Sequence, residues 1–296
     1  MATYLNGYTL LEKLWIQLVG YNSNISSYVN GTDTTGPYSN DQIMDGINAA
    51  QRFLYNALFT RIPYEFEEEI ELTGVSSVYT LPADFGQLRL FRDSDGNQIH
   101  PIATNQRRKT SGSGNANLYY RKGSTLVIDK ASVTEVCKLF YYRKCRDIHQ
   151  GIASAGGSAS ITFATTAKKI VDYYNGLTLE NITKDWVDTV DDYAVTRIAT
   201  ISETAASDDY YGTVSDIPES FHFLMIPRAV FEITGNYPIA KEKPGVVGVE
   251  LFNQQFISTL RAYAGAPLDT YPENTWCAYA GGGGGGNSNP YNLPGH

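Results

Sequence analysis

The segment VSDIPESFHFLMIPRAVFEIT, residues 214–234, decides the fold that we expect for this chain. Ser215 and Asp216 are residue types that accept hydrogen bonds from free backbone N–H groups, and Pro218 suits a first helical turn. Apolar residues follow at helical spacing, namely Phe221, Leu224, Met225, Ala229 and Ile233. The pattern predicts one helix, which Pro227 should kink because proline removes a backbone hydrogen bond and crowds the preceding turn.

Composition limits the classes of protein that fit. The chain has 296 residues, 42% of them hydrophobic, and a formal net charge of −8, which argues against a general nucleic-acid binder. That charge is compatible with a channel through which DNA passes without being tightly bound. Three cysteines give no disulfide framework, the first 20 residues lack the basic start of a signal peptide, and no membrane-length apolar run occurs. We therefore expect a protein made in a reducing cytosol, and the 22 tyrosines favour extensive subunit contact.

Three further helices are predicted around residues 9–20, 39–60 and 246–263. Thr9 with Glu12, and Ser39 with Gln42, have the spacing of a capping box. We expect the 21–38 segment between the first two helices to be a polar loop. The polar side of the 39–60 helix either faces solvent or meets a neighbouring subunit. The candidate interface residues on it are Asp45, Asn48, Gln51, Arg52 and Tyr55.

Short strands are predicted between the second helix and residue 148. Turn signals at Asp93–Gly96 and Lys122-Gly123 separate pairs of apolar runs and indicate hairpins. Residues 151–213 begin with a small-residue linker and contain nine acidic and four basic residues, which indicates a solvated β-rich module. We thus expect an α+β fold: a bundle of about four helices, a β-hairpin region and an inserted small β-module.

This pattern divides the chain into three parts. Residues 1–150 and 214–264 form the predicted core, 151–213 form the inserted β-rich module, and 265–296 form a flexible C-terminal arm. The arm carries aromatic residues around six consecutive glycines, at positions 281–286, and cannot bury a core of its own. It is either disordered or ordered by a partner surface.

No catalytic or metal-binding constellation is evident in the sequence. There is no P-loop, GxSxG or HExxH motif, and the four histidines are scattered. Asp93, Asp95 and Asn97 match half of a calcium loop, but Thr104 stands where the twelfth-position glutamate should be, which favours a hairpin turn. We therefore expect no enzyme activity, no cofactor and no metal.

Basic residues gather in three groups that suggest a second role, namely Arg107-Arg108-Lys109, Arg121-Lys122, and Arg143-Lys144 with Arg146. They either serve solubility or face phosphates in a channel. The candidate channel residues are Arg107, Arg108, Lys109, Arg143 and Lys144.

The order of these elements resembles that of the head-to-tail adaptor proteins of tailed bacteriophages, the neck or head-completion proteins under the portal. Three motifs carry the resemblance: DQIMDGINAAQRFLYNAL (41–58), LPADF (81–85) and IPESFH (217–222). The resemblance covers roughly residues 40–148 and 214–264, and the 151–213 insertion departs from the simplest adaptors.

The resemblance implies a virion structural protein of the neck, made in the bacterial cytoplasm, that forms a twelve-fold ring. Such a ring binds the portal protein, extends the DNA channel without sequence specificity, and offers a platform to tail nozzle, tube or fibre proteins, with no membrane contact. The C-terminal arm would reach the portal, with Tyr271, Trp276, Tyr279, Tyr291 and Leu293 as its anchors. The alternative is a tail or fibre-attachment protein whose 151–213 module binds a fibre or a host glycan.

Overall fold

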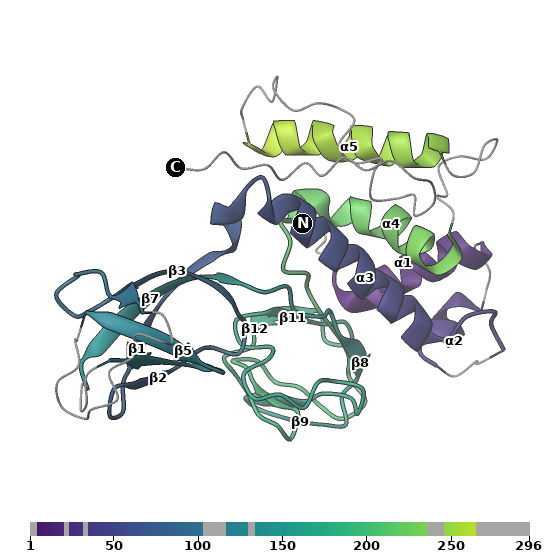
Figure 1. The fold of residues 1–296 in the computed structure, drawn as a ribbon. Helices are drawn as coiled ribbons and strands as arrows, with labels where there is room; N and C mark the ends of the chain where they lie inside the picture. The colour runs from purple at the N-terminus through teal and green to yellow at the C-terminus, as the bar shows by residue number, and fades with distance from the viewer. Residues whose placement is uncertain are drawn as a thin grey trace.

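The computed structural model describes residues 5–20, 24–31, 35–102, 117–129, 134–235 and 246–264. These residues contain five α-helices and fifteen strands, which group into a helical unit, a hairpin unit and an inserted module. The helices lie on one side of the molecule and the two β-units on the other (Figure 1). The α+β prediction is confirmed, but the chain is richer in β-structure than a bundle of about four helices, and such a bundle is not shown.

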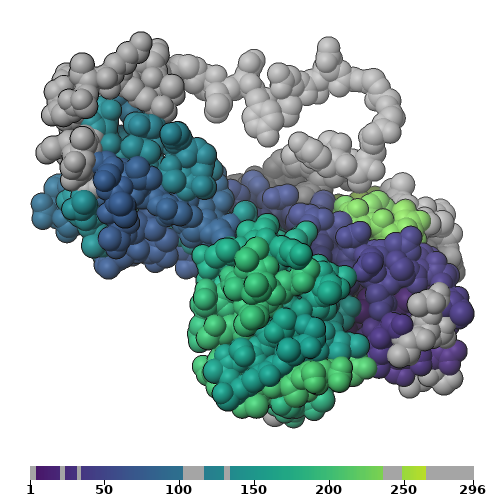
Figure 2. Space-filling model, turned by 90° about the horizontal axis from the view of Figure 1, so that it is seen from below, coloured from purple at the N-terminus to yellow at the C-terminus, as the bar shows by residue number. Residues whose placement is uncertain are grey.

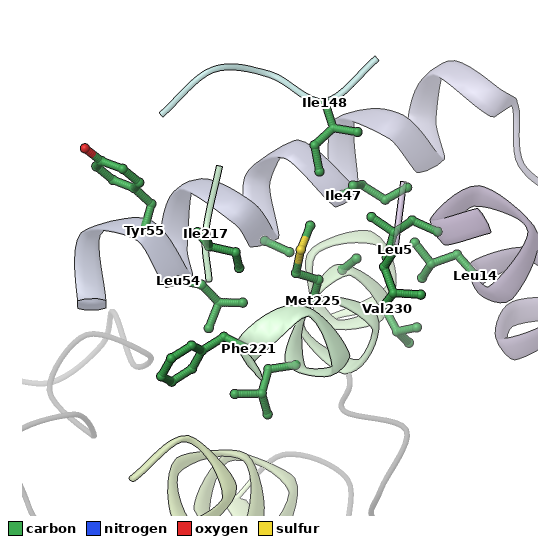
Figure 3. Packing of buried hydrophobic residues seen from close by; sticks show 14 of the residues in the cluster. Leu5, Leu14, Ile47, Leu54, Tyr55, Ile148, Ile217, Phe221, Met225 and Val230 are labelled. Atoms are coloured by element: carbon green, nitrogen blue, oxygen red, sulfur yellow. The ribbon is translucent and has the colours of Figure 1, made fainter. Parts of the chain in front are cut away.

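The helical unit is assembled from both ends of the chain. Its elements are α1 (Gly7–Val19), α2 (Ile25–Val29), α3 (Asn40–Phe59), α4 (Met225–Thr234) and α5 (Val246–Ala264), with the 3-10 helices η1 (Pro63–Phe66) and η3 (Glu219–Leu224). Their buried side chains form one hydrophobic core, in which Ile47 and Leu54 of α3 lie beside Met225 and Val230 of α4 (Figure 3). Gly46 permits this approach, because a Cβ there would lie 2.6 Å from the Ile233 side chain.

Two predicted features of the N-terminal helices need correction. Helix α1 begins at Gly7, and its cap is Asn6, whose side chain accepts from the Thr9 backbone; the predicted cap at Thr9 is wrong. The predicted 21–38 loop contains the short helix α2. The capping box of Ser39 and Gln42 on α3 is confirmed.

The 214–234 segment differs most from its prediction. It forms η3 and then α4 rather than one kinked helix, and neither Ser215 nor Asp216 caps it, because both side chains bond elsewhere in the fold. Pro227 lies in the first turn of α4, where backbone N–H groups have no intrahelical partner, so it causes no break there. Gly235 ends α4 in the left-handed conformation, which favours glycine at the end of a helix.

The hairpin unit contains two sheets. Its strands are β1 (Glu67–Thr73), β2 (Val78–Thr80), β3 (Phe85–Arg92), β4 (His100–Pro101), β5 (Leu118–Lys122), β6 (Thr125–Ile128) and β7 (Val136–Arg143). They form the sheets β1-β7-β3 and β2-β6-β5-β4, in which only β4 and β5 pair in parallel. Both predicted turns are present, since Gly96 donates to the Asp93 carbonyl and β5 pairs with β6 across Lys122-Gly123.

The inserted module also contains two sheets. Its strands are β8 (Gln150–Ile152), β9 (Ala155–Gly157), β10 (Ser160–Thr162), β11 (Thr178–Asn181), β12 (Trp186–Thr189), β13 (Asp192–Tyr193), β14 (Ile198–Thr200) and β15 (Tyr210–Thr213). The sheets are β12-β11-β15-β8 and β13-β14-β10-β9. The buried side chains of the module, including Phe163, Tyr174, Tyr193 and Tyr211, form a hydrophobic cluster separate from that of the helices. In Figure 2 the module and the hairpin unit form two distinct lobes.

Candidate functional site

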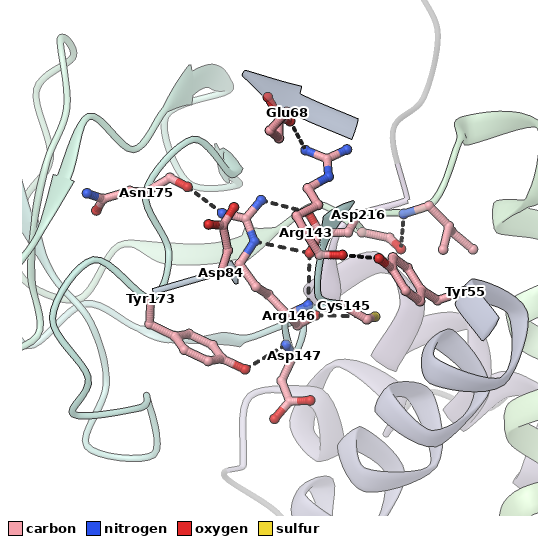
Figure 4. A network of polar contacts seen from close by, with 12 residues as sticks. Tyr55, Glu68, Asp84, Arg143, Cys145, Arg146, Asp147, Tyr173, Asn175 and Asp216 are labelled. Atoms are coloured by element: carbon pink, nitrogen blue, oxygen red, sulfur yellow. Dashed lines mark hydrogen bonds and ion pairs between the residues drawn. The ribbon is translucent and has the colours of Figure 1, made fainter. Parts of the chain in front are cut away.

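Residues 143–149, from the last residue of β7 to the residue before β8, lie where the three units meet, and we call them the junction segment. Figure 4 shows side chains from all three units converging on it. Tyr55 comes from the helical unit, Asp84 from the hairpin unit, and Tyr173 and Asn175 from the inserted module. The segment therefore sets how the units are oriented relative to one another.

Helix α3 binds the junction segment through its polar side. The Asn48 side chain donates to the Ile148 carbonyl at 3.1 Å and accepts from the Ile148 N–H at 2.7 Å. Gln51 donates to the Arg146 carbonyl at 2.5 Å, and the Tyr55 hydroxyl donates to the Arg143 carbonyl. After β7 the backbone no longer has a neighbouring strand to bond with. The side chains of α3 take the place of that strand, so the buried backbone N–H and C=O groups of the junction segment still form hydrogen bonds.

A buried ion pair holds the centre of the junction. The Arg146 guanidinium donates to both carboxylate oxygens of Asp216, at 2.7 and 3.1 Å, and both residues are buried. Burial opposes the charge on Arg146, but the hydrogen bonds and attraction of Asp216 outweigh it and raise the pKa of the guanidinium. The Arg146 backbone N–H also donates to Asp216, at 2.9 Å. A charge-assisted, bidentate pair of this kind fixes the relative orientation of the two side chains.

The same arginine reaches the inserted module. Its guanidinium donates to the Asn175 carbonyl, and the Asp147 N–H beside it donates to the Tyr173 hydroxyl at 2.9 Å. Asp147 also pairs with Lys168 of the module at 3.1 Å and with Arg52 of α3 at 2.6 Å. The module is thus bonded to the junction segment at several points.

His149 ends the junction segment inside the module's aromatic cluster. Its ring nitrogens lie 3.1 Å from the Tyr211 hydroxyl and 3.0 Å from the Thr166 hydroxyl. The ring stacks on Phe163 with 5.9 Å between ring centroids. Burial, with the positive charges of Lys168 and Arg197, lowers the pKa of His149 to about 4. This histidine is therefore neutral at physiological pH.

The five residues predicted as a subunit interface lie along this side of α3. Asn48, Gln51 and Tyr55 are buried and bonded to the chain's own junction segment, whereas Asp45 and Arg52 are exposed. Three of these side chains therefore have a structural role within one chain. That this side meets a neighbouring subunit stays a prediction, which Asp45 and Arg52 would have to carry.

The predicted channel and arm residues are placed only in part. Arg143 is half-buried and pairs with Glu68 at 3.0 Å, and Lys144 is exposed. Arg107, Arg108 and Lys109 lie outside the described residues, as do all arm residues, namely Tyr271, Trp276, Tyr279, Tyr291 and Leu293.

The junction segment contains one thiol, that of Cys145. Burial, followed by the nearby Asp216 carboxylate, raises the pKa of the Cys145 thiol, which keeps it protonated. Among the residues that the structure describes, no group of three or more His, Cys, Asp or Glu residues is placed to hold a metal ion. Nor does any helix in the described ranges have the length and apolarity needed to cross a membrane.

Sequence reasoning missed the ion pair at the centre of the site. Arg146 and Asp216 are 70 residues apart in the sequence. The sequence alone suggests that Arg146 is part of a basic group and that Asp216 is a helix cap. No spacing in a single sequence signals such a contact.

Comparison with known families gives one match. Residues 23–154 match the family model described as SU10 adaptor protein, which supports the resemblance to phage adaptors. The matched range contains α2, α3, the hairpin unit and the junction segment. No curated protein matches the chain. Over residues 23–154, but not over most of the inserted module or the later helices, the chain is similar to the SU10 adaptor proteins.

Proposed function

We propose that this protein is a structural adaptor of a tailed-phage virion, placed between portal and tail. The observation that carries the proposal is the adaptor-family match, because it falls on α3 and the hairpin unit, which hold two of the three motifs that suggested the same role. A role in assembly needs surfaces held in fixed orientation rather than reactive groups. The junction segment favours such rigidity because it bonds to all three units. Its Arg146 carbonyl accepts from Gln51 of α3, its Lys144 N–H donates to the Asp84 carbonyl of the hairpin unit, and its Arg146 guanidinium donates to the Asn175 carbonyl of the module.

The finer proposal is a twelve-fold ring that extends the DNA channel and binds tail proteins. In a closed ring each contact joins two different surfaces, one from each neighbouring copy. Exposed Asp45 and Arg52 of α3, and exposed Lys144 at the junction, are the described candidates for contact with a neighbour and with passing DNA.

The test is electron cryomicroscopy of the protein bound to its portal protein. Twelve-fold class averages with the chain beneath the portal would support the adaptor role. Trimers, or six-fold rings away from the portal, would favour the alternative of a tail or fibre-attachment protein.

Truncation tests the proposed portal contact of residues 265–296. We expect a chain ending at residue 264 to keep its thermal melting curve. The buried hydrophobic residues of the helical core, of the module and of a third cluster in the hairpin unit all lie within residues 5–260. We also expect it to lose portal binding in a pull-down with purified portal. Unchanged portal binding would refute the role of Tyr271, Trp276, Tyr279, Tyr291 and Leu293.

A further inference from the structure

The hairpin unit has a core of its own. Its buried residues form a hydrophobic cluster that shares no residue with the helical core or with the module's cluster. Ion pairs also join its strands to one another, since Lys138 of β7 pairs with Glu69 of β1 at 3.0 Å and Arg89 of β3 pairs with Glu67 of β1. The unit can therefore keep its internal geometry when its position changes.

Two adjacent connections join the hairpin unit to the rest of the chain. Helix η1 ends at Phe66, directly before β1, and β7 ends at Arg143, where the junction segment begins. Glu67 at the start of β1 pairs with Tyr142 near the end of β7, so the two connections lie side by side. Phe66 is fully buried in the helical core, which anchors one of them. A unit held at two neighbouring element ends has the geometry of a hinge.

The contacts between the hairpin unit and helix α3 lie at this base. The Tyr55 hydroxyl donates to the last carbonyl of β7, and the Phe59 ring meets the Tyr142 ring edge to face, with 5.2 Å between centroids. The Lys144 N–H of the junction segment donates to the Asp84 carbonyl at 2.7 Å. These contacts hold the base of the unit in place. Because they lie close to the two connections, they have little leverage on its tilt.

The inserted module, which forms a separate lobe in Figure 2, is held at two separate places. Beside the junction segment, the Asp147 N–H donates to the Tyr173 hydroxyl at 2.9 Å. At the start of α1, the Asn6 side chain donates to Glu180 of β11, and Asn6 forms a β-bridge with Val214. Tilting the module would break bonds at one of these places. The helical unit and the module are therefore the fixed part against which the hairpin unit can tilt.

Two cavities adjoin the base of the hairpin unit. The first, of about 290 Å³, lies between α3 and β3, and Asn56 and Gln87 are among its lining residues. The second, of about 430 Å³, faces the module and η3, where Thr178 and Ser220 line it. Arg143, the last residue of β7, lines both cavities. Protein interiors are otherwise close-packed, so these spaces give the unit room to tilt either way without displacing packed atoms.

We propose that the hairpin unit tilts as a rigid body about its base, between a position closer to α3 and a position closer to the module and η3. The hinge is formed by the two connections, at residues 66–67 and 143–144. It lets one unit change its orientation while the other two keep theirs, so the chain can adapt its shape when it binds a partner. The motion does not depend on the adaptor role, which would stand if the hinge were refuted.

Distances between spin labels test the tilt. Asp95 lies in the turn after β3, whose eight residues place it about 25 Å from the base, so each 10° of tilt moves it by about 4 Å. Nitroxides are attached to p-acetylphenylalanine introduced at the exposed positions Asp95 and Gln17 of the full chain, which leaves the cysteines unlabelled. Labelled protein is diluted with unlabelled protein, so that distances within one chain are measured.

The control pair joins Gln17 of α1 to Glu203, an exposed residue of the module. We expect double electron–electron resonance to give a distance distribution at least about twice as wide for Asp95 with Gln17 as for the control pair, because only the first pair spans the hinge. Equal widths would refute the hinge.

Tryptophan substitutions test whether the cavities are the space into which the unit tilts. Asn56→Trp fills the cavity beside α3, and Ser220→Trp fills the cavity beside the module and η3; both positions are exposed. The two variants should shift the mean distance between Asp95 and Gln17 in opposite directions. Asp45→Trp, at an exposed position of α3 outside both cavities, is the matched control and should leave the distance unchanged.

Circular dichroism melts check that the three tryptophan variants fold. Shifts in the same direction, or no shift in either cavity variant, would overturn the proposed tilt. The comparison of label pairs in the wild-type chain needs no tryptophan variant, so it decides the matter even where one of these variants fails to fold.

Discussion

His149 couples the junction segment to pH. Its ring is buried among Phe163, Tyr174 and Tyr211, and its pKa is lowered from 6.5 to about 4 in the folded chain, first by burial and then by Lys168 and Arg197. Between these two values the unfolded chain binds a proton that the folded chain does not. The contribution of His149 to the free energy of unfolding is therefore fully present above pH 6.5. It decreases as the pH falls toward 4, by about 3 kcal/mol in all.

The prediction is tested with His149→Gln, which keeps a hydrogen-bonding side chain but does not titrate. We expect the wild type to lose about 3 kcal/mol more unfolding free energy than the variant between neutral pH and about pH 4. Urea unfolding at several pH values measures this difference. Acid effects of other groups, including His222, are common to both proteins and cancel; equal losses would contradict the assignment.

The Arg146–Asp216 pair should be strongly coupled. Removing one partner leaves the other as a buried, uncompensated charge. Arg146→Met and Asp216→Asn should therefore each lower the free energy of unfolding by about 3–5 kcal/mol. The double variant should lower it by less than the sum of the two single losses. In it no charge remains buried, and the amide oxygen that replaces the carboxylate can still accept from the backbone N–H of residue 146.

Urea unfolding of the two single variants, the double variant and the wild type measures this coupling. Arg52→Met is the control, because it breaks an ion pair whose arginine is 51% exposed and should cost less than about 1 kcal/mol. Strictly additive losses for Arg146 and Asp216 would show that the pair does not act as a unit.

At the scale of elements, Gly212 lets β15 approach the start of α1. A Cβ at this position would lie 2.8 Å from the Asn6 side chain and 2.8 Å from the Tyr8 backbone nitrogen. A backbone atom cannot move aside as a flexible side chain can. Gly212→Ala should therefore push the module away from α1 and lower the free energy of unfolding by about 1–3 kcal/mol. Gly157→Ala is the control within the module, since its nearest atom is a serine hydroxyl at 3.1 Å.

Hydrogen exchange measures the expected separation. Amides of β15 and of the first turn of α1 should exchange faster in Gly212→Ala than in the wild type, while those of α4 and the hairpin unit should not change. Uniform acceleration throughout the chain would instead indicate general loss of stability.

Local signals in the sequence predicted the elements that local interactions control. Ser39 caps α3 as its spacing with Gln42 requires, and the hairpin turns follow from Gly96 and Gly123, which have positive φ. The same reasoning failed where a distant partner takes the side chain. Ser215 bonds to Gln51 and Asp216 to Arg146, so the helix that both were predicted to cap begins only after Pro218. The candidate site was missed for that reason: it is made of tertiary contacts.

At the scale of the whole molecule, the inserted module can be removed, because the strands by which the chain enters and leaves it lie side by side. β8 and β15 are antiparallel neighbours, and the Ala153 N–H donates to the Asp209 carbonyl at 2.8 Å. A two-residue Asn-Gly turn can therefore replace residues 154–208 without moving the strands that enter and leave the module. The module's hydrophobic cluster shares no residue with the helical core.

We expect the excised chain to keep its helical circular dichroism signal and to melt cooperatively, at a temperature lower by about 5–10 °C. The loss arises because the Asn175 carbonyl and the Tyr173 hydroxyl no longer hold Arg146 and Asp147, so the junction segment keeps only its bonds to α3, Asp84 and Asp216 and to the strand residue Thr213. Loss of the cooperative melt would show that the helices depend on the module for folding. Retained portal binding by the excised chain would assign the portal contact to the remaining units, and a ring that fails to close would place the contact between copies on the module.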